Sequence, residues 1–366
     1  MKYILISILL FGAASFCFMY SIKEIPQKPP KIPKLPIDFL SSHEHKNSVS
    51  IKKLRLCDQK RSITYGNAWN CPDDPTCVKC QKRSIKRHNS MLNEFEKEKQ
   101  KRSIEYQKFD KNQPIIIVSL NKGYEKLFRN FLCSLETNNL KNILKNMYVL
   151  PCEKSAVQLL DSLKNVRYSK ANNWMNNFTI NEKFKGTNIG HHYLINALTF
   201  VVMNEMIQEG FSVLLMDADI IFRKSPLPYL QSLMETPEFT NIDFVCQHTG
   251  RNDERSPCNT GFVFFRPTER IKTLTQTLRE TIALRPQRSD QLWFNTIIKN
   301  IWFHNLNYNF FNSEMFYKRG SHSKHLDSQK VLYHAVGPNK EKKFKSYNDW
   351  FLNNKCSYYK NMTDIV

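Results

Sequence analysis

The segment Val213–Phe222 reads VLLMDADIIF, and it decides the fold because two carboxylates interrupt an otherwise apolar run. An apolar run of this length is typical of a buried β-strand. Residues two apart in extended backbone face the same way, so Asp217 and Asp219 can present their oxygens together. Unpaired carboxylates beside a core are costly, and a hard divalent cation is their simplest partner. An Asp-x-Asp pair alone is also common in loops and helix caps, so the apolar strand before it carries the prediction of a metal site.

Strand-like and helix-like segments alternate on both sides of this segment, from Pro114 toward the C-terminus. This alternation favours an α/β domain with a Rossmann-like, nucleotide-binding layout. Ligands of open α/β sheets bind at the carboxyl ends of strands, which is where the aspartate pair lies. We expect strands at 114–120, 147–150, 211–216, 243–245, 261–265 and 331–333, and helices at 124–136, 156–163, 193–208, after Pro267 and at 291–298.

Three polar motifs follow the aspartate pair, each beside a predicted strand or helix. They are Asn-Thr-Gly at 259–261, Asp-Gln at 290–291 and His-x-x-Gly-x-x-Lys at 334–340. In this order the motifs resemble those of retaining glycosyltransferases of the GT-A fold, such as glycogenin and bacterial galactosyltransferases. The nucleotide-diphospho-sugar transferase domain family has the most similar sequence pattern, because its aspartate pair precedes a Pro-Leu-Pro-Tyr-like segment, here 226–229. The resemblance covers about residues 114–350.

The resemblance implies a metal shell and a phosphate site. Asp217, Asp219 and His334 would hold Mn²⁺ or Mg²⁺, and Asp217 would also contact the ribose of the nucleotide-sugar donor. Lys340 would meet the donor phosphates, and Gly337 would let the backbone approach them. A cation and a lysine at these places would neutralise the departing diphosphate.

The resemblance also implies a sugar site. Asn259 and Gly261 would line the donor sugar, and the catalytic pair Asp290 and Gln291 would lie beside the anomeric carbon. A retaining reaction proceeds through a covalent intermediate or by attack on the face that the diphosphate leaves. Asp290 is the carboxylate we nominate as nucleophile or orienting group, and a helix N-cap is its alternative interpretation.

The function implied is transfer of a hexosyl or pentosyl group from a nucleotide-sugar donor, expected to be a UDP-sugar, to a glycan or glycoprotein acceptor. Two other interpretations stay open. A catalytically silent protein of this fold would bind nucleotide sugars or glycans without turnover. A metal-dependent nucleotidyltransferase also uses paired aspartates on a nucleotide-binding sheet.

The N-terminal region is interpreted as a membrane anchor followed by a stem. Tyr3–Ile22 has no charged residue and has the roughly 20 residues of a membrane-spanning helix, so we place a transmembrane signal anchor at 1–22. A signal peptide cleaved near Gly12–Ala14 is the alternative. Residues 23–110 form a Pro- and Lys-rich, cysteine-containing stem, and 111–366 form the transferase domain. The net charge of +21 favours an anionic partner, and the anchor argues against nucleic acid.

The orientation expected is single-pass type II in the Golgi or ER, with a lumenal domain or a form secreted after cleavage. Lysines after the anchor favour the opposite orientation. Nine of the ten cysteines lie beyond the anchor, and glycosylation sequons begin at Asn177 and Asn361, which favours the lumen. The pentapeptide Gln-Lys-Arg-Ser-Ile, at Gln59, Gln81 and Gln100, is a candidate dibasic processing site or part of a solvated linker.

Two disulfides are considered within the transferase domain. Cys246 and Cys258 are predicted to pair across a charged loop. Cys133 and Cys152 are a second candidate pair, between the first helix and the second strand.

Overall fold

The computed structural model describes part of one of two compact units, residues 50–366. The expected anchor, the stem up to residue 89 and both sequons lie outside the described residues. Within the described part, no helix combines the length and the apolar character needed to cross a membrane. The described residues are 90–163, 165–176, 189–235, 241–249, 258–284, 290–299, 306–313, 315–318, 330–353 and 355–359.

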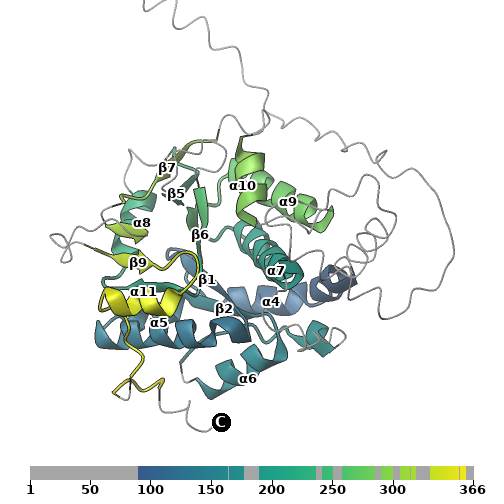
Figure 1. Cartoon of the computed structure of the whole chain (residues 1–366). Helices are drawn as coiled ribbons and strands as arrows, with labels where there is room; N and C mark the ends of the chain where they lie inside the picture. Colours follow the sequence, from purple (N-terminus) through teal and green to yellow (C-terminus); the bar gives the residue numbers. More distant parts are fainter. Residues whose placement is uncertain are drawn as a thin grey trace, which may run out of the picture. The chain divides into compact units, whose positions relative to one another are not determined.

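A six-stranded sheet forms the centre of the described fold (Figure 1). In spatial order the strands are β2 (Met147–Pro151), β1 (Ile115–Leu120), β3 (Val213–Met216), β6 (Cys258–Phe265), β5 (Phe244–His248) and β7 (Tyr308–Phe310). Neighbouring strands pair in parallel between β1 and β2, β1 and β3, and β5 and β7, whereas β6 runs antiparallel to β3 and β5. The expected α/β class is therefore confirmed.

Both faces of this sheet are buried, because apolar residues alternate between two hydrophobic clusters. Along β1, Ile115 and Ile117 belong to one cluster, and Ile116 and Val118 belong to the other. One face is covered by α4 (Lys99–Tyr106), α7 (Ile189–Gln208), α9 (Glu269–Leu284) and α10 (Asp290–Ile298). The other is covered by α5 (Glu125–Thr137), α6 (Lys154–Ser162) and α8 (Leu227–Glu235).

A second, three-stranded sheet changes the interpretation of Val213–Phe222. The strand predicted at 211–216 ends at Met216, as β3 does, but the extended backbone expected through both carboxylates is wrong, because residues 218–219 turn and β4 (Ile220–Phe222) begins a new sheet. There β4 pairs antiparallel with β9 (Leu332–His334), which pairs in parallel with β8 (Phe316–Lys318). The chain leaves the central sheet where charged residues replace apolar ones, and the apolar residues of β4 are buried in the second sheet.

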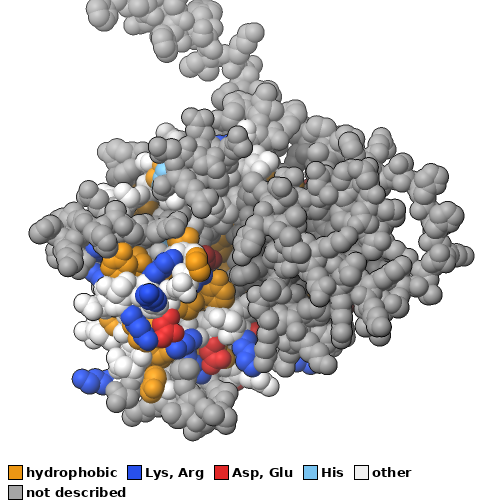
Figure 2. All heavy atoms as spheres, viewed as in Figure 1, with side chains coloured by type: hydrophobic (Ala, Val, Ile, Leu, Met, Phe, Trp, Pro, Cys, Tyr) orange, Lys and Arg blue, Asp and Glu red, His pale blue; other side chains and the backbone are white. Residues whose placement is uncertain are grey.

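Helix α11 (Lys340–Ser346), which the sequence did not predict, follows β9 and lies beside α5 (Figure 1). Lys126 of α5 forms an ion pair of 2.7 Å with Glu341 of α11, and Lys345 forms another with the same carboxylate. Figure 2 shows blue and red side chains interspersed over this face. The positive charge of the chain is therefore not gathered there into a patch of one sign.

The described core begins earlier than the sequence placed it. Residues 23–110 were expected to be stem, yet Phe95 and Tyr106 are fully buried. Arg102 of α4 is also fully buried and donates to both carboxylate oxygens of Glu205 in α7, over 2.9 and 2.7 Å. The third Gln-Lys-Arg-Ser-Ile copy, at 100–104, thus supplies a buried ion pair, a role that a stem does not require.

Of the two disulfides considered, one is confirmed and one is wrong. Cys246 of β5 bonds Cys258 of β6, as predicted. Cys133 does not bond Cys152, which is a buried free thiol whose pKa is raised by burial. Cys133 is bonded instead to Cys356, 223 residues away in the sequence.

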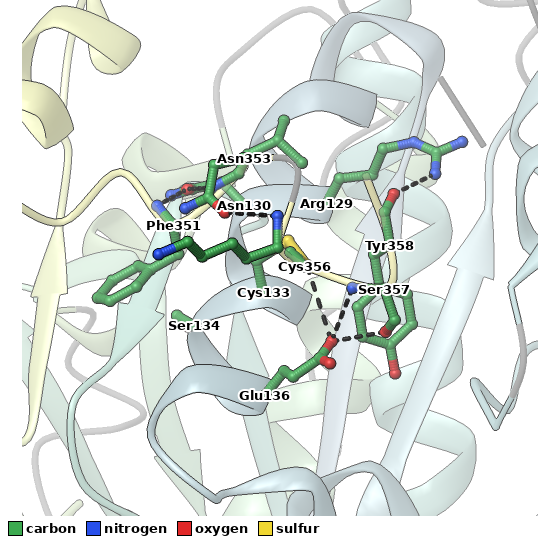
Figure 3. Close-up of a disulfide and its surroundings, with 12 residues drawn as sticks. Arg129, Asn130, Cys133, Ser134, Glu136, Phe351, Asn353, Cys356, Ser357 and Tyr358 are labelled. Atoms are coloured by element: carbon green, nitrogen blue, oxygen red, sulfur yellow. Dashed lines mark hydrogen bonds between the residues drawn. A yellow bond between two sulfur atoms is a disulfide. The ribbon is translucent and has the colours of Figure 1, made fainter. Parts of the chain in front are cut away.

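The Cys133–Cys356 disulfide belongs to a set of contacts that hold the C-terminal segment on α5 (Figure 3). The Glu136 carboxylate accepts hydrogen bonds from the backbone and the hydroxyl of Ser357. Arg129 donates to the carbonyl of Tyr358 over 2.9 Å. One face of α5 packs on the sheet, and this second set of contacts fixes the segment that follows α11.

Candidate functional site

Three candidate metal ligands meet where the chain passes between the two sheets. Asp217 directly follows β3, Asp219 directly precedes β4, and His334 is the last residue of β9. The β4–β9 pairing aligns Ile220 with His334, and the backbone N–H of Ala335 donates to the carbonyl of Asp219 over 3.1 Å. This register brings the imidazole beside both carboxylates.

The geometry leaves one side of the cluster open. His334 Nε2 lies 3.7 Å from Asp217 Oδ2 and 3.5 Å from Asp219 Oδ1. One possible ligand atom from each residue lies within 4.8 Å of the others. Asp219 and His334 are buried, whereas the Asp217 side chain is 55% exposed. An ion held here can therefore be reached from outside on the Asp217 side.

Asp219 Oδ1 shows that the cluster fits a cation. This oxygen is buried and has no hydrogen-bond partner among the described residues, and 3.5 Å from His334 Nε2 is too long for a good hydrogen bond. A carboxylate oxygen in that situation is costly unless a charge compensates it. Carboxylate oxygens and an imidazole nitrogen are suitable ligands for Mn²⁺ or Mg²⁺.

Gly261 makes room for the cluster. A Cβ atom at this position would lie 2.3 Å from Asp217 Oδ2 and 2.7 Å from His334 Cε1, closer than such atoms approach in real structures. The carbonyl of Gly261 also accepts a 2.8 Å hydrogen bond from the backbone N–H of Asp217. The absence of a side chain at 261 therefore allows the strand to run directly behind the ligands.

Lys340, the first residue of α11, supplies a positive charge to the same cluster. Its ammonium lies 2.5 Å from Asp219 Oδ2 and donates to the Tyr124 hydroxyl over 2.9 Å. Burial alone would raise the pKa of Asp219, but the positive charges of His334 and Lys340 and the hydrogen bond from Lys340 outweigh it and lower this pKa to about 2. Burial would likewise lower the pKa of Lys340, but Asp219 raises it. Both groups are therefore charged at neutral pH.

The residues expected at the donor sugar form a second connected group. Asn259 Oδ1 accepts from the backbone N–H of Gly261 over 2.9 Å, and Asn259 Nδ2 donates to Gln291 Oε1 over 3.3 Å. Asp290 is the first residue of α10, and its side chain lies outside those described. The structure thus joins Asn259 to Gln291 and, through Gly261, to the aspartate pair.

Gly337 precedes α11 and has a φ of +82°, a backbone conformation that is strained for residues with a side chain. The contacts of Gly337 and Lys340 with donor phosphates, which the resemblance implies, stay predictions. The bend at 337 returns the chain so that α11 begins at the aspartate cluster.

Two residues of the site were missed by the sequence analysis. Tyr124 lies just beyond the carboxyl end of β1 and contacts Lys340 through its hydroxyl. Gln247, on β5, is hydrogen-bonded to His334. Tyr124 could have been found from its position shortly after a predicted parallel strand. Gln247 could have been found as a polar residue at the end of an apolar strand.

The sequence of residues 177–346 matches the model of a family described as nucleotide-diphospho-sugar transferase. This region, a little under half of the chain, is therefore similar to a nucleotide-diphospho-sugar transferase domain. The matched range includes all three candidate metal ligands and Lys340, whereas β1 and β2 precede it. Together with the central sheet of mixed direction, it identifies the GT-A fold that the resemblance implied. Among curated proteins, none matches the sequence.

Solved structures similar to this chain include three glycosyltransferases. One is involved in glycosylation of the major capsid of PBCV-1; it is 12% identical, with 64% of this chain and 98% of that chain covered and a TM-score of 0.40. Mouse xyloside xylosyltransferase 1 is 12% identical, with coverages of 62% and 98% and a TM-score of 0.39. The WbbM bifunctional glycosyltransferase is 14% identical, with coverages of 70% and 52% and a TM-score of 0.44.

Proposed function

We propose that the chain transfers a sugar from a UDP-sugar donor to a hydroxyl group of a glycan or glycoprotein acceptor. The observation that carries this proposal is the buried Asp219 Oδ1, which has no hydrogen-bond partner among the residues described. It lies beside Asp217 and His334, within the range that matches the nucleotide-diphospho-sugar transferase model. A divalent cation bound there, Mn²⁺ or Mg²⁺, would supply Lewis-acid neutralisation of the departing diphosphate. Whether the sugar is a hexose or a pentose is set by side chains around the sugar site.

The protein's own groups have separate roles in this proposal. Asp217, Asp219 and His334 hold the cation, and the exposed side of Asp217 faces the entering nucleotide. Lys340 lies against Asp219 through a flexible side chain, so its ammonium is within reach of a phosphate bound at the same cation. A lysine aimed at the leaving group stabilises the charge that develops there.

The sugar site in this proposal is built around Asn259 and Gln291. Their mutual hydrogen bond fixes two polar side chains beside the aspartate cluster, where they can orient the sugar hydroxyls. Retention at the anomeric carbon is proposed from the order of the motifs, with Asp290 as the carboxylate that orients or attacks that carbon.

The compartment is also part of the proposal. We place the domain in the lumen of the Golgi or ER, held by a type II anchor at 1–22, with secretion after cleavage as the alternative. The disulfides Cys133–Cys356 and Cys246–Cys258 support an oxidising environment.

Donor hydrolysis by the full-length protein tests the function. UDP-glucose, UDP-galactose, UDP-xylose and UDP-arabinose are screened with Mn²⁺ and with EDTA, for the wild type and for Asp219→Ala. We expect metal-dependent UDP release from one donor, abolished in Asp219→Ala. Asp161→Ala is the matched control, since that carboxylate is an exposed partner of Lys170.

The same assay separates the other interpretations. Donor binding without UDP release, with or without added glycan acceptors, would show a silent nucleotide-sugar-binding protein. Release of pyrophosphate from a nucleoside triphosphate would show a nucleotidyltransferase. Failure to bind any of these nucleotides would overturn the proposal.

A further inference from the structure

Gln247 connects the two sheets at the candidate metal site. It lies on β5 of the central sheet, and its side chain is buried against the second sheet. Its Oε1 is 2.7 Å from His334 Nδ1, and its Nε2 donates to the carbonyl of Phe316 over 3.0 Å. One amide therefore contacts two neighbouring strands, β9 and β8, of the other sheet.

The partners of Gln247 determine which way its amide faces. The carbonyl of Phe316 can only accept a hydrogen bond, so the amide nitrogen must face it. The amide oxygen then faces His334, and because that oxygen can only accept, Nδ1 of the ring must carry a proton. In the neutral ring, Nε2 is consequently the unprotonated nitrogen, and this is the atom that faces Asp217 and Asp219.

The backbone of β5 contributes to this arrangement. The pairing of β5 with β6 shifts register between Cys246 and Gln247, so the strand is irregular directly before the glutamine. Irregularities of this kind bend a strand and redirect the side chains that follow. The Cys246–Cys258 disulfide fixes both strands beside the shift.

We propose that Gln247 is the positioning residue of the metal site, which selects the tautomer and the ring orientation of His334 so that Nε2 is the ligand atom. This inference rests on the proposed function, because it assigns a role in holding the cation of that same site. It also explains how a site split between two sheets keeps its geometry. Asp217 follows the central sheet and His334 belongs to the second, and Gln247 joins the two.

Two substitutions at 247 test this role. Gln247→Leu removes the acceptor of the Nδ1 proton, whereas Gln247→Glu keeps an acceptor there. Asn204→Leu is the matched control, because Asn204 is an equally buried amide that accepts from Thr275 and donates to Gln276 between α7 and α9. All four full-length proteins are titrated with Mn²⁺ in the presence of UDP, and free Mn²⁺ is followed by its EPR signal.

We expect Gln247→Leu to weaken Mn²⁺ binding about 10- to 100-fold, the usual effect of losing a ligand's supporting hydrogen bond. Gln247→Glu should retain most of the affinity, and Asn204→Leu should match the wild type. Equal affinity in Gln247→Leu and the wild type would overturn the positioning role. So would an equal loss in Gln247→Leu and Asn204→Leu, because that pattern indicates only a loosened core.

A second measurement needs no metal. Long-range ¹H–¹⁵N NMR spectra distinguish the two histidine tautomers, and His334→Asn identifies the signals of this ring. At a pH where the ring is neutral, we expect the proton on Nδ1 in the wild type and in Gln247→Glu, and a mixture in Gln247→Leu. A proton on Nε2 in the wild type would overturn the inference. A wild type with the expected tautomer that binds neither Mn²⁺ nor UDP would instead overturn the proposed function and, with it, the role in metal binding.

Discussion

The ammonium of Lys340 lies 2.5 Å from Asp219 Oδ2, whereas Oδ1 of the same carboxylate has no hydrogen-bond partner in the described part of the chain. One carboxylate thus has a cation on one oxygen and a free coordination position on the other. Lys340 and a metal ion can both compensate this buried negative charge. The lysine is a permanent part of α11, whereas a metal ion can bind and leave.

Replacing Lys340 by Met should therefore affect metal binding and turnover in opposite directions. Mn²⁺ affinity without nucleotide should rise, because no fixed positive charge repels the ion. The turnover number for donor hydrolysis should fall about 100-fold, because one electrostatic partner of the leaving group is lost. EPR titration and UDP release measure the two effects. Lys342→Met, an exposed position on the same helix, should change neither.

Metal binding should weaken as the pH falls, because His334 must lose a proton to act as a ligand. Burial alone would lower the pKa of His334, but Asp219 and Asp217 raise it above its ordinary value. Asp219, with a pKa of about 2, stays ionised in the same range. Below the raised pKa each bound ion should release up to one proton. Calorimetry in buffers of different ionisation enthalpy measures the number of protons released. Proton release that persists in His334→Asn would show that the proton does not come from His334.

Gly261→Ala should abolish Mn²⁺ binding while leaving the domain folded. The new Cβ would lie 2.3 Å from Asp217 Oδ2 and 2.7 Å from His334 Cε1, so both ligand side chains must shift, and the exposed Asp217 side chain can move away more easily than β6 can. Circular dichroism checks the fold, and EPR checks the metal. Gly123→Ala is the control, because its Cβ would meet only Asn121 Oδ1, at 3.4 Å. Wild-type Mn²⁺ affinity in Gly261→Ala would show that Asp217 is not a ligand.

The two disulfides should contribute unequally to stability. Cys133–Cys356 closes a loop of sequence separation 223, and Cys246–Cys258 closes one of 12. A longer loop removes more entropy from the unfolded chain, so paired Cys→Ser substitutions should cost more at 133 and 356, within about 2–5 kcal/mol. Urea unfolding of both double variants measures the difference, and a larger loss for the short loop would argue against the entropic origin.

Arg102→Met should destabilise the domain by about 3–5 kcal/mol, because it leaves the Glu205 carboxylate buried without its cationic partner. Arg102→Met combined with Glu205→Gln should recover much of that loss. The double-variant cycle in urea measures the coupling. Additive losses would show that the pair contributes only through packing.

The sequence predicted the elements whose apolar residues form a continuous run or recur at helical spacing. The apolar run at 114–120 became β1, and the helix expected at 124–136 became α5, because one is buried on both faces and the other has one continuous apolar stripe. The aspartate pair was found by the same reasoning, since two charges in an apolar run require compensation. Its three-dimensional setting differs, because the chain changes sheets between the two carboxylates.

Contacts between segments that are distant in the sequence could not be predicted from local sequence patterns. Cys356 is one of several cysteines that spacing alone could assign to Cys133, and only the docking of the C-terminal segment on α5 selects it. Arg102 lies in a basic, polar stretch, so its burial depends on Glu205, a carboxylate on a different helix. The role of Gln247 likewise depends on the pairing of two strands that its own neighbours do not reveal.

The docking of α4 on α7 sets a practical limit on how short a recombinant version of this domain can be made. A fragment starting at Lys108, shortly before the strand predicted at 114–120, would lack Phe95, Arg102 and Tyr106. It would expose apolar surface on α7 and carry an uncompensated Glu205, both of which favour aggregation during expression. A start upstream of Met91 and an end beyond Tyr358 keep these contacts within one soluble piece.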